Sequence, residues 1–279
     1  MKEFFGIGGY EREAEGAYSW QHLLFVSLLM VAMVVLAVFL GRKYKGAEEK
    51  AKNKVLIWSA ILIDAVELFL IVILCIRSGE LEPIKRKLPL FLCSIQLIAI
   101  PLAAFSKGKL RNAALDFVFI FGLLGAVFGT FGAAQNYNAY PVLCIDNVAS
   151  GITHSISGFA SLYIVISGME SMKKENVLFT FLILIGFCVL ALVANFTLDY
   201  NYMFLMNHDG TPYVIFYDLV GGNPVLYPMI VVGLFLIYIF LFYQVYFWIK
   251  NKSFPISFKS KNELQASLAV TEDEKKTND

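Results

Sequence analysis

The chain has 279 residues, of which 58% are hydrophobic and 16% charged, with a formal net charge of +1. A soluble core of this size has no room for so many apolar side chains, so the composition excludes an ordinary soluble domain and indicates a membrane protein. A net charge this small says little by itself, because the placement of charges along the chain carries the information.

Seven apolar runs dominate the chain. A bilayer core of about 30 Å needs about 20 residues of helix, and each run is close to that length. The predicted spans are residues 22–40, 55–76, 88–106, 113–132, 148–168, 177–196 and 225–249. We therefore predict an all-α fold, a polytopic transmembrane helical bundle of about seven spans, formed by residues 1–252. The polar remainder, residues 253–279, is typical of a disordered cytoplasmic tail.

Basic residues are distributed unevenly between the two predicted sides. Of the 23 Lys and Arg residues, 17 lie in segments 41–54, 107–112 and 169–176 and beyond residue 249, and six lie in the alternate segments. Basic residues accumulate on the cytoplasmic side of membrane proteins. The chain is therefore predicted to be a multi-pass cell-membrane protein with its N-terminus outside and its C-terminus in the cytoplasm.

Two acidic residues, Asp64 and Glu67, lie within the second predicted span. Their spacing of three places both on one helix face, and an ionisable group inside a span points to function by default. These buried acids could orient a histidine, or they could pair with polar partners that hold helices together. Their depth favours a supporting role over direct chemistry.

The segment 77–87 carries Arg77, Lys85, Arg86 and Lys87 on the predicted outer side, against the charge rule. Either one span is miscounted or the positive charge has a use. If it has a use, the last three residues could hold the phosphate of a lipid head group.

Cys93 lies near the start of the third predicted span, about 8 Å below the outer surface at 1.5 Å per helical residue. A thiol at this depth is either a nucleophile or a small buried hydrophobe, as Cys188 is expected to be. Cys75 and Cys144 both fall on the predicted outer side, where a disulfide between them is one alternative. None of the four cysteines has CxxC spacing, so no metal site is expected.

Small and polar residues form stripes on the fourth and fifth predicted spans. The fourth offers a glycine face typical of close helix packing: Gly122, Gly125, Gly129 and Gly132. The fifth carries a polar stripe: Ser150, His154, Ser157 and Ser161. Since lipid cannot face such a stripe, it either lines a cavity or forms hydrogen bonds between helices. His154 lies about 9 Å below the outer surface, which matches the depth of Cys93.

The sixth predicted span ends outward in polar residues that include Asn195 and Asn201. The following segment, 197–224, is long and unusually apolar, which is consistent with a lid or a re-entrant segment. Cys93, His154 and the polar end of the sixth span are thus expected at a similar depth below the outer surface, although they are far apart in sequence. Gln96, Ser150, Ser157, Asn195 and Asn201 are the expected supporting polar groups or oxyanion donors.

Several of these segments resemble the YwaF family of bacterial integral membrane proteins, which is distantly similar to a vertebrate acyltransferase of ether phospholipids. The resemblance rests on Leu88-Pro89-Leu90-x-x-Cys93, on the span of His154, and on Asn195 followed by Asn201-Tyr202-Met203-Phe204-Leu205. It implies a cysteine that carries an acyl group as a thioester and a histidine that assists it, at Cys93 and His154.

Two positions depart from that family pattern. Phe91 stands where the family often has histidine, which removes a second base beside Cys93. The aromatic turn before the last span is reduced to Gly222-Asn223-Pro224-Val225-Leu226-Tyr227, which bears on the expected lid.

We therefore expect an acyltransferase that moves a fatty acyl chain from a phospholipid to a lysolipid or another acceptor through a thioester on Cys93, in the outer leaflet. His154 would take the proton of the thiol. The alternative is a non-enzymatic protein that binds or transports a lipid or a small solute in the same cavity. The expected partners are membrane phospholipids, and neither nucleic acid nor a cofactor is expected.

Overall fold

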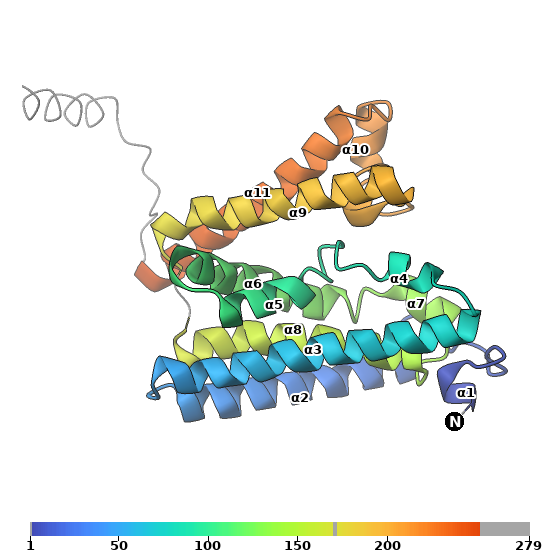
Figure 1. The fold of residues 1–279 in the computed structure, drawn as a ribbon, viewed down its shortest axis with the longest axis horizontal. Coiled ribbons are helices and arrows are strands. Elements are labelled where there is room, and N and C mark those ends of the chain that lie inside the picture. Colours follow the sequence, from blue (N-terminus) through green and yellow to red (C-terminus); the bar gives the residue numbers. More distant parts are fainter. Residues whose placement is uncertain (1, 170–171, 252–279) are drawn as a thin grey trace, which may run out of the picture. The chain divides into compact units, whose positions relative to one another are not determined.

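The computed structural model describes residues 2–169 and 172–251, and within them it contains helices and no strand (Figure 1). The predicted all-α fold is confirmed. Six helices are long and apolar enough to cross a membrane: α2 (Trp20–Tyr44), α3 (Glu49–Ser78), α6 (Gly108–Phe128), α8 (Ile145–Ser167), α9 (Val177–Leu198) and α11 (Leu226–Asn251). The short helices are α1 (Lys2–Phe5), α4 (Glu82–Arg86), α5 (Gln96–Phe105), α7 (Ala134–Ala139) and α10 (Val214–Leu219), with 3₁₀ turns η1 (Lys174–Asn176) and η2 (Tyr202–Phe204).

The third predicted span, 88–106, is wrong in its first half, because helix α5 begins only at Gln96. Pro89 supplies no backbone N–H for a helical turn and disfavours helical geometry at the residue before it. The Ser94 hydroxyl then bonds both the N–H and the carbonyl of Phe91, at 3.1 Å each. Residues 88–95 therefore form an irregular segment that leads into a short apolar helix.

Helix α8 is the packing centre and contacts α2, α3 and α6. The predicted glycine seam is confirmed at Gly122, where an added Cβ would lie 2.7 Å from the carbonyl oxygen of Ser157. The hydroxyls of Ser157 and Ser161 cross the same contact and donate to the carbonyls of Gly122 and Phe119 at 3.3 and 2.9 Å. The inner half of the predicted polar stripe thus holds α6 and α8 together.

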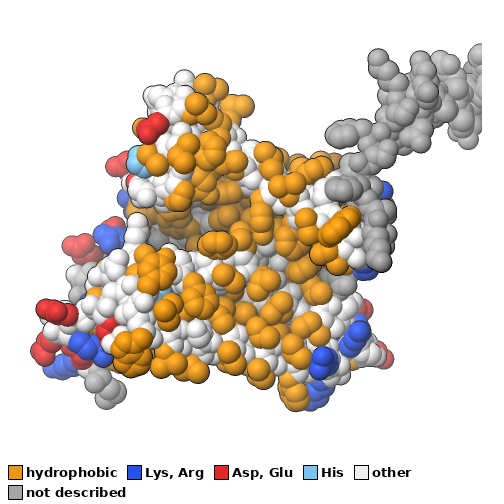
Figure 2. Space-filling view, turned by 180° about the vertical axis from the view of Figure 1, so that it is seen from behind, with side chains coloured by type: hydrophobic (Ala, Val, Ile, Leu, Met, Phe, Trp, Pro, Cys, Tyr) orange, Lys and Arg blue, Asp and Glu red, His pale blue; other side chains and the backbone are white. Residues whose placement is uncertain are grey.

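Hydrophobic side chains cover the outside of the long helices as well as their contacts. Figure 2 shows one face, on which hydrophobic side chains form a broad band and charged side chains gather toward the two ends. Leu28, Phe39 and Leu68 are examples on α2 and α3, each about 60% exposed. Such a surface suits lipid rather than water.

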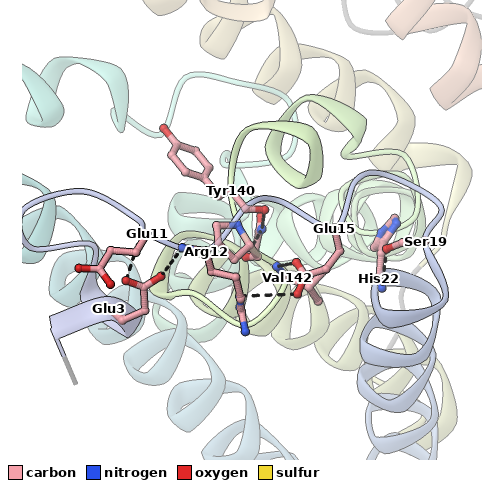
Figure 3. A network of polar contacts seen from close by, with 10 residues as sticks. Glu3, Glu11, Arg12, Glu15, Ser19, His22, Tyr140 and Val142 are labelled. Carbon is pink, nitrogen blue, oxygen red and sulfur yellow. Dashed lines mark hydrogen bonds and ion pairs between the residues drawn. The ribbon is translucent and has the colours of Figure 1, made fainter.

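The N-terminal segment folds over the end of the bundle where α3 stops and α8 starts. Phe4 and Phe5 of α1 pack against a buried cluster of α3 and α8 that includes Leu70 and Ile145. Glu15 accepts a hydrogen bond from the backbone of Val142 at 2.7 Å (Figure 3). Contacts so far apart in sequence make this segment an integral part of the fold.

The chain divides into two compact units, Met1–Ile239 and Phe240–Asp279. The described part of the second unit is the last portion of α11, where Lys250 donates to the hydroxyl of Tyr246 at 2.8 Å. The predicted tail, 253–279, lies outside the described residues. All of the candidate site lies within the first unit.

Candidate functional site

Cys93 and His154 line one polar cavity of about 330 Å³. Its polar lining residues come from α3, α4, α7, α8 and two irregular segments: Glu67, Arg86, Lys87, Ser94, Asn136, Ser150, Thr153 and Tyr200. Ile63, Leu88, Phe91 and Leu97 complete the wall. The thiol and the imidazole that the sequence analysis paired by depth therefore share one cavity.

The irregular segment before α5 determines the surroundings of Cys93. The side chain is exposed to the cavity, and its Cα packs over Gly125 of α6, where an added Cβ would lie 4.0 Å away. In the part of the chain that the structure describes, the backbone N–H groups of Cys93 and Ser94 donate to no carbonyl. These groups lie at the N-terminal end of the turn that continues into α5, where the helix leaves its first amides unpaired. Both N–H groups lie close to the Cys93 sulfur and can donate to it.

His154 projects from α8 toward Gly129, the C-cap residue of α6. A Cβ at position 129 would collide with Cε1 and Nδ1 of the imidazole, so only glycine leaves room for the ring there. Cys93 and His154 therefore pack against two glycines of α6 that are one helical turn apart. Among the described residues no hydrogen bond joins the two side chains, although they line the same cavity.

The two acids of α3 do not share a role. Glu67 faces the cavity, where its carboxylate lies 3.9 Å from Nζ of Lys87. Asp64 is exposed, so the prediction that it is buried is wrong. A separation of three residues leaves two side chains about 60° apart around a helix, which is enough to turn one inward and the other outward.

Each of the four basic residues of segment 77–87 has a partner in the structure. Arg77 makes two bonds with Asp146, at 2.7 and 2.9 Å. Arg86 pairs with Glu82 at 2.7 Å, and Lys87 pairs with Glu67. Arg86 and Lys87 also line the cavity.

Lys85 differs from its two neighbours, because it does not line the cavity. Its Nζ donates to the carbonyl of Asp199 at 3.2 Å and lies 5.5 Å from the centre of the Tyr200 ring. Its carbonyl accepts the hydroxyl of Tyr202 at 2.5 Å. Lys85 thus ties α4 to the segment after α9, and of the three predicted head-group residues the cavity includes Arg86 and Lys87.

The expected supporting residues divide between cavity and scaffold. Ser150 lines the cavity, whereas Ser157 bonds Gly122. Asn195 uses its amide on both backbone groups of Tyr202, at 2.6 and 3.1 Å. Asn201 is likewise engaged within its own loop, accepting from Met206 and Asn207 and donating to Asn207 and Asp209. Both asparagines therefore bond groups of their own loop. The hydrogen-bond donors beside the Cys93 sulfur are the backbone N–H groups of Cys93 and Ser94.

Gln96 is the first residue of α5. It is 1% exposed, and in the described part of the chain neither amide atom has a hydrogen-bond partner. It does not line the cavity. The predicted role of Gln96 as a supporting group in this cavity therefore has no contact behind it in the described residues.

The loop after α9 packs beside the cysteine through aromatic rings. Phe91 contacts Tyr200, Tyr202 and Phe204, with ring centres 5.5–6.2 Å apart. Segment 197–224 includes η2 and α10, so it folds into short helices, and its role as a lid or re-entrant segment stays a prediction. All four cysteines are free, so Cys75 and Cys144 are not bridged.

Six long apolar helices and a polar cavity among their ends define a multi-pass membrane protein. The chain belongs to the TMEM164 family, whose model matches residues 17–246. Searches of curated proteins and of solved structures found no match. The match confirms the multi-pass membrane class, while the resemblance to the YwaF family and to an ether-phospholipid acyltransferase stays a prediction.

Proposed function

We propose that this protein is a membrane acyltransferase that carries a fatty acyl group on Cys93. The observation that supports it is the shared cavity, which combines a thiol, an imidazole and two cationic side chains, Arg86 and Lys87. These are the groups needed to attack a lipid ester and to bind a lipid phosphate.

In the first step His154 takes the proton of the Cys93 thiol, and the thiolate attacks the carbonyl carbon of a phospholipid ester. The tetrahedral intermediate collapses, the carbon–oxygen bond to the glycerol breaks, and the imidazolium returns the proton to the departing oxygen. The products are a lysolipid and an acyl thioester on Cys93.

In the second step the hydroxyl of a lysolipid or another acceptor gives its proton to His154 and attacks the thioester. The carbon–sulfur bond breaks, and the thiolate recovers the proton from the imidazolium. The enzyme is restored without a cofactor, and the acyl chain has moved from one oxygen to another.

The backbone N–H groups of Cys93 and Ser94 are suited to stabilise the oxyanion of both steps. They donate to no carbonyl among the described residues and flank the attacking sulfur. Preorganised donors of this kind are worth about 2.7–4 kcal/mol each in enzymes that transfer acyl groups. They replace Asn195 and Asn201 in this role, because those amides are used by the loop.

The charge distribution supports a site in the outer leaflet. Under the positive-inside rule the end of the bundle that holds the cavity is the outer end, with the N-terminus outside and the C-terminus in the cytoplasm. Arg86 and Lys87 would then lie at the depth of outer-leaflet phosphates.

A second function, lipid or solute binding without catalysis, is favoured by one observation. Cys93 and His154 share a cavity without a hydrogen bond between them within the described residues, whereas general-base catalysis needs about 3 Å or one bridging water. In that function the sulfur is dispensable.

The mass of the purified protein distinguishes the two. We expect an adduct of fatty-acyl mass on Cys93 that hydroxylamine removes and that Cys93→Ala lacks. The matched control is Cys188→Ala, which removes a buried thiol packed 3.8 Å from the sulfur of Met203 and should keep the adduct. Acyl transfer at the normal rate by Cys93→Ala would rule out the covalent mechanism and leave binding or transport.

A further inference from the structure

An apolar groove of about 440 Å³ opens on the other side of Cys93. Leu124 and Phe128 of α6 form one wall, and Phe204, Tyr213 and Phe235 from the loop and α11 form the opposite wall. Its lining contains no charged residue. The volume lies within the range of small-ligand sites, about 300–1,000 Å³.

The groove and the polar cavity share two lining residues, Phe91 and Cys93. The sulfur therefore lies where a polar, cationic space meets an apolar one. A phospholipid ester has the same division, with a charged head group on one side of the carbonyl and a hydrocarbon chain on the other.

We infer that this groove binds the acyl chain of the lipid whose ester carbonyl meets Cys93, while the head group occupies the polar cavity. The inference rests on the proposed acyltransferase function and specifies how its substrate lies. A chain that moves from lipid tails into an apolar groove exchanges one apolar environment for another, so the groove serves to orient the ester rather than to supply affinity.

Gly125 supports this placement at the mouth of the groove. An added Cβ there would find the Cα of Cys93 at 4.0 Å as its nearest neighbour, so the space beside the thiol is open. The first carbons of a chain bound to the sulfur can pass over this glycine.

A second apolar groove, of about 370 Å³ between α2, α3 and α8, provides the comparison. It is lined by residues such as Leu36 and Leu62 and shares no residue with the polar cavity. Apolar lining alone does not point to a substrate chain, and contact with Cys93 distinguishes the first groove.

The test uses the full chain in phosphatidylcholine vesicles doped with a phosphatidylcholine that carries a diazirine near the end of one acyl chain. After photolysis, peptide mapping should find the label on Leu124, Phe128 and Phe204. Leu124→Trp and, separately, Gly125→Val should lower that labelling about tenfold, which corresponds to ~1.4 kcal/mol. Leu62→Trp, which fills the other groove, should leave it unchanged.

Label that concentrates on the α2–α3 groove, or that is equal in wild type, Leu124→Trp and Gly125→Val, would overturn the inference. Cys93→Ser separates it from the proposed function. Groove labelling that persists in Cys93→Ser supports the groove whether or not wild type forms an adduct. An acyl adduct on wild-type Cys93 with no groove labelling leaves the enzyme function standing and overturns the groove. A well-folded elution profile in detergent is required of each variant.

Discussion

Gly129 shows how one missing side chain shapes the site. The imidazole of His154 occupies the space that a Cβ at position 129 would need. The same helix packs Gly125 under Cys93, so two glycines place the thiol and the imidazole along one wall. Gly129 is the C-cap residue directly after α6, so the helix ends where the imidazole packs.

Gly129→Ala should therefore displace His154 and lower the rate of Cys93 acylation by at least tenfold, since a shift of about 1 Å can cost roughly 10²-fold. Overpacking costs about 1–3 kcal/mol, so stability should fall as well. The measurements are the rate of adduct formation and the denaturant midpoint.

Gly186→Ala on α9 is the control, because nothing lies within 4 Å of a Cβ there. It should gain stability and acylate normally. A Gly129→Ala protein that acylates at the wild-type rate would show that the position of His154 does not matter to the chemistry.

The meeting of Cys93 and His154 was predicted from their matched depth, although the depth of Cys93 assumed a helix that is absent at that residue. The two side chains line one cavity because the irregular segment 88–95 keeps the thiol near the same end of the bundle, while the catalytic role of the pair stays a prediction. The backbone N–H groups of Cys93 and Ser94 could not be predicted as donors beside the sulfur. Every residue has an N–H, and only the three-dimensional structure shows which of them donate to no carbonyl.

At the scale of elements, six of the seven predicted spans form long helices among the described residues, because an apolar run of about 20 residues is a local property of sequence. The break in the third run was missed, although Pro89 and Ser94 are its signals, because apolarity continued across it. Asp64 is exposed and Glu67 faces the cavity because of how α3 is rotated in the bundle. A spacing of three residues does not determine that rotation.

The N-terminal segment is an element whose attachment should depend on pH. The hydroxyl of Tyr10 donates to Asp146 at 2.6 Å and accepts from Arg77 at 3.1 Å. Burial, followed by the hydrogen bond to Asp146, raises the pKa of Tyr10 above its usual value of about 10. The folded state therefore retains this proton more strongly than the unfolded state, so the stabilisation is complete below pH about 10 and is lost as pH rises above it.

Limited proteolysis at the exposed Gly8–Gly9 pair should accordingly become faster above pH about 10 in the wild type. Tyr10→Phe should be cleaved faster at neutral pH and should lose most of the pH dependence. Tyr18→Phe is a suitable control, since Tyr18 is 63% exposed. Equal pH profiles for wild type and Tyr10→Phe would assign the effect to other groups.

At the scale of the whole molecule, the basic residues of segment 77–87 run against the positive-inside rule, and the structure gives them acidic partners. Arg77 is neutralised by Asp146, Arg86 by Glu82 and Lys87 by Glu67. Paired charges are a weak obstacle to placing this end outside. Segment 41–54, by contrast, holds six Lys and Arg residues, and the ion pair found within it among the described residues joins Lys52 and Glu49. The orientation predicted from the sequence therefore remains the proposal that the charges favour.

Labelling of single cysteines tests that orientation in a background where the four native cysteines are alanine. Glu80→Cys, beyond the end of α3, should react with a membrane-impermeant maleimide in intact cells, because it lies at the end that holds the cavity. Gly46→Cys, in the α2–α3 connection, should react only after permeabilisation, because its basic neighbours keep it in the cytoplasm. The two exposed positions serve as each other's control for thiol reactivity. The reverse pattern would turn the molecule over and place the thiol, its cavity and its groove in the inner leaflet.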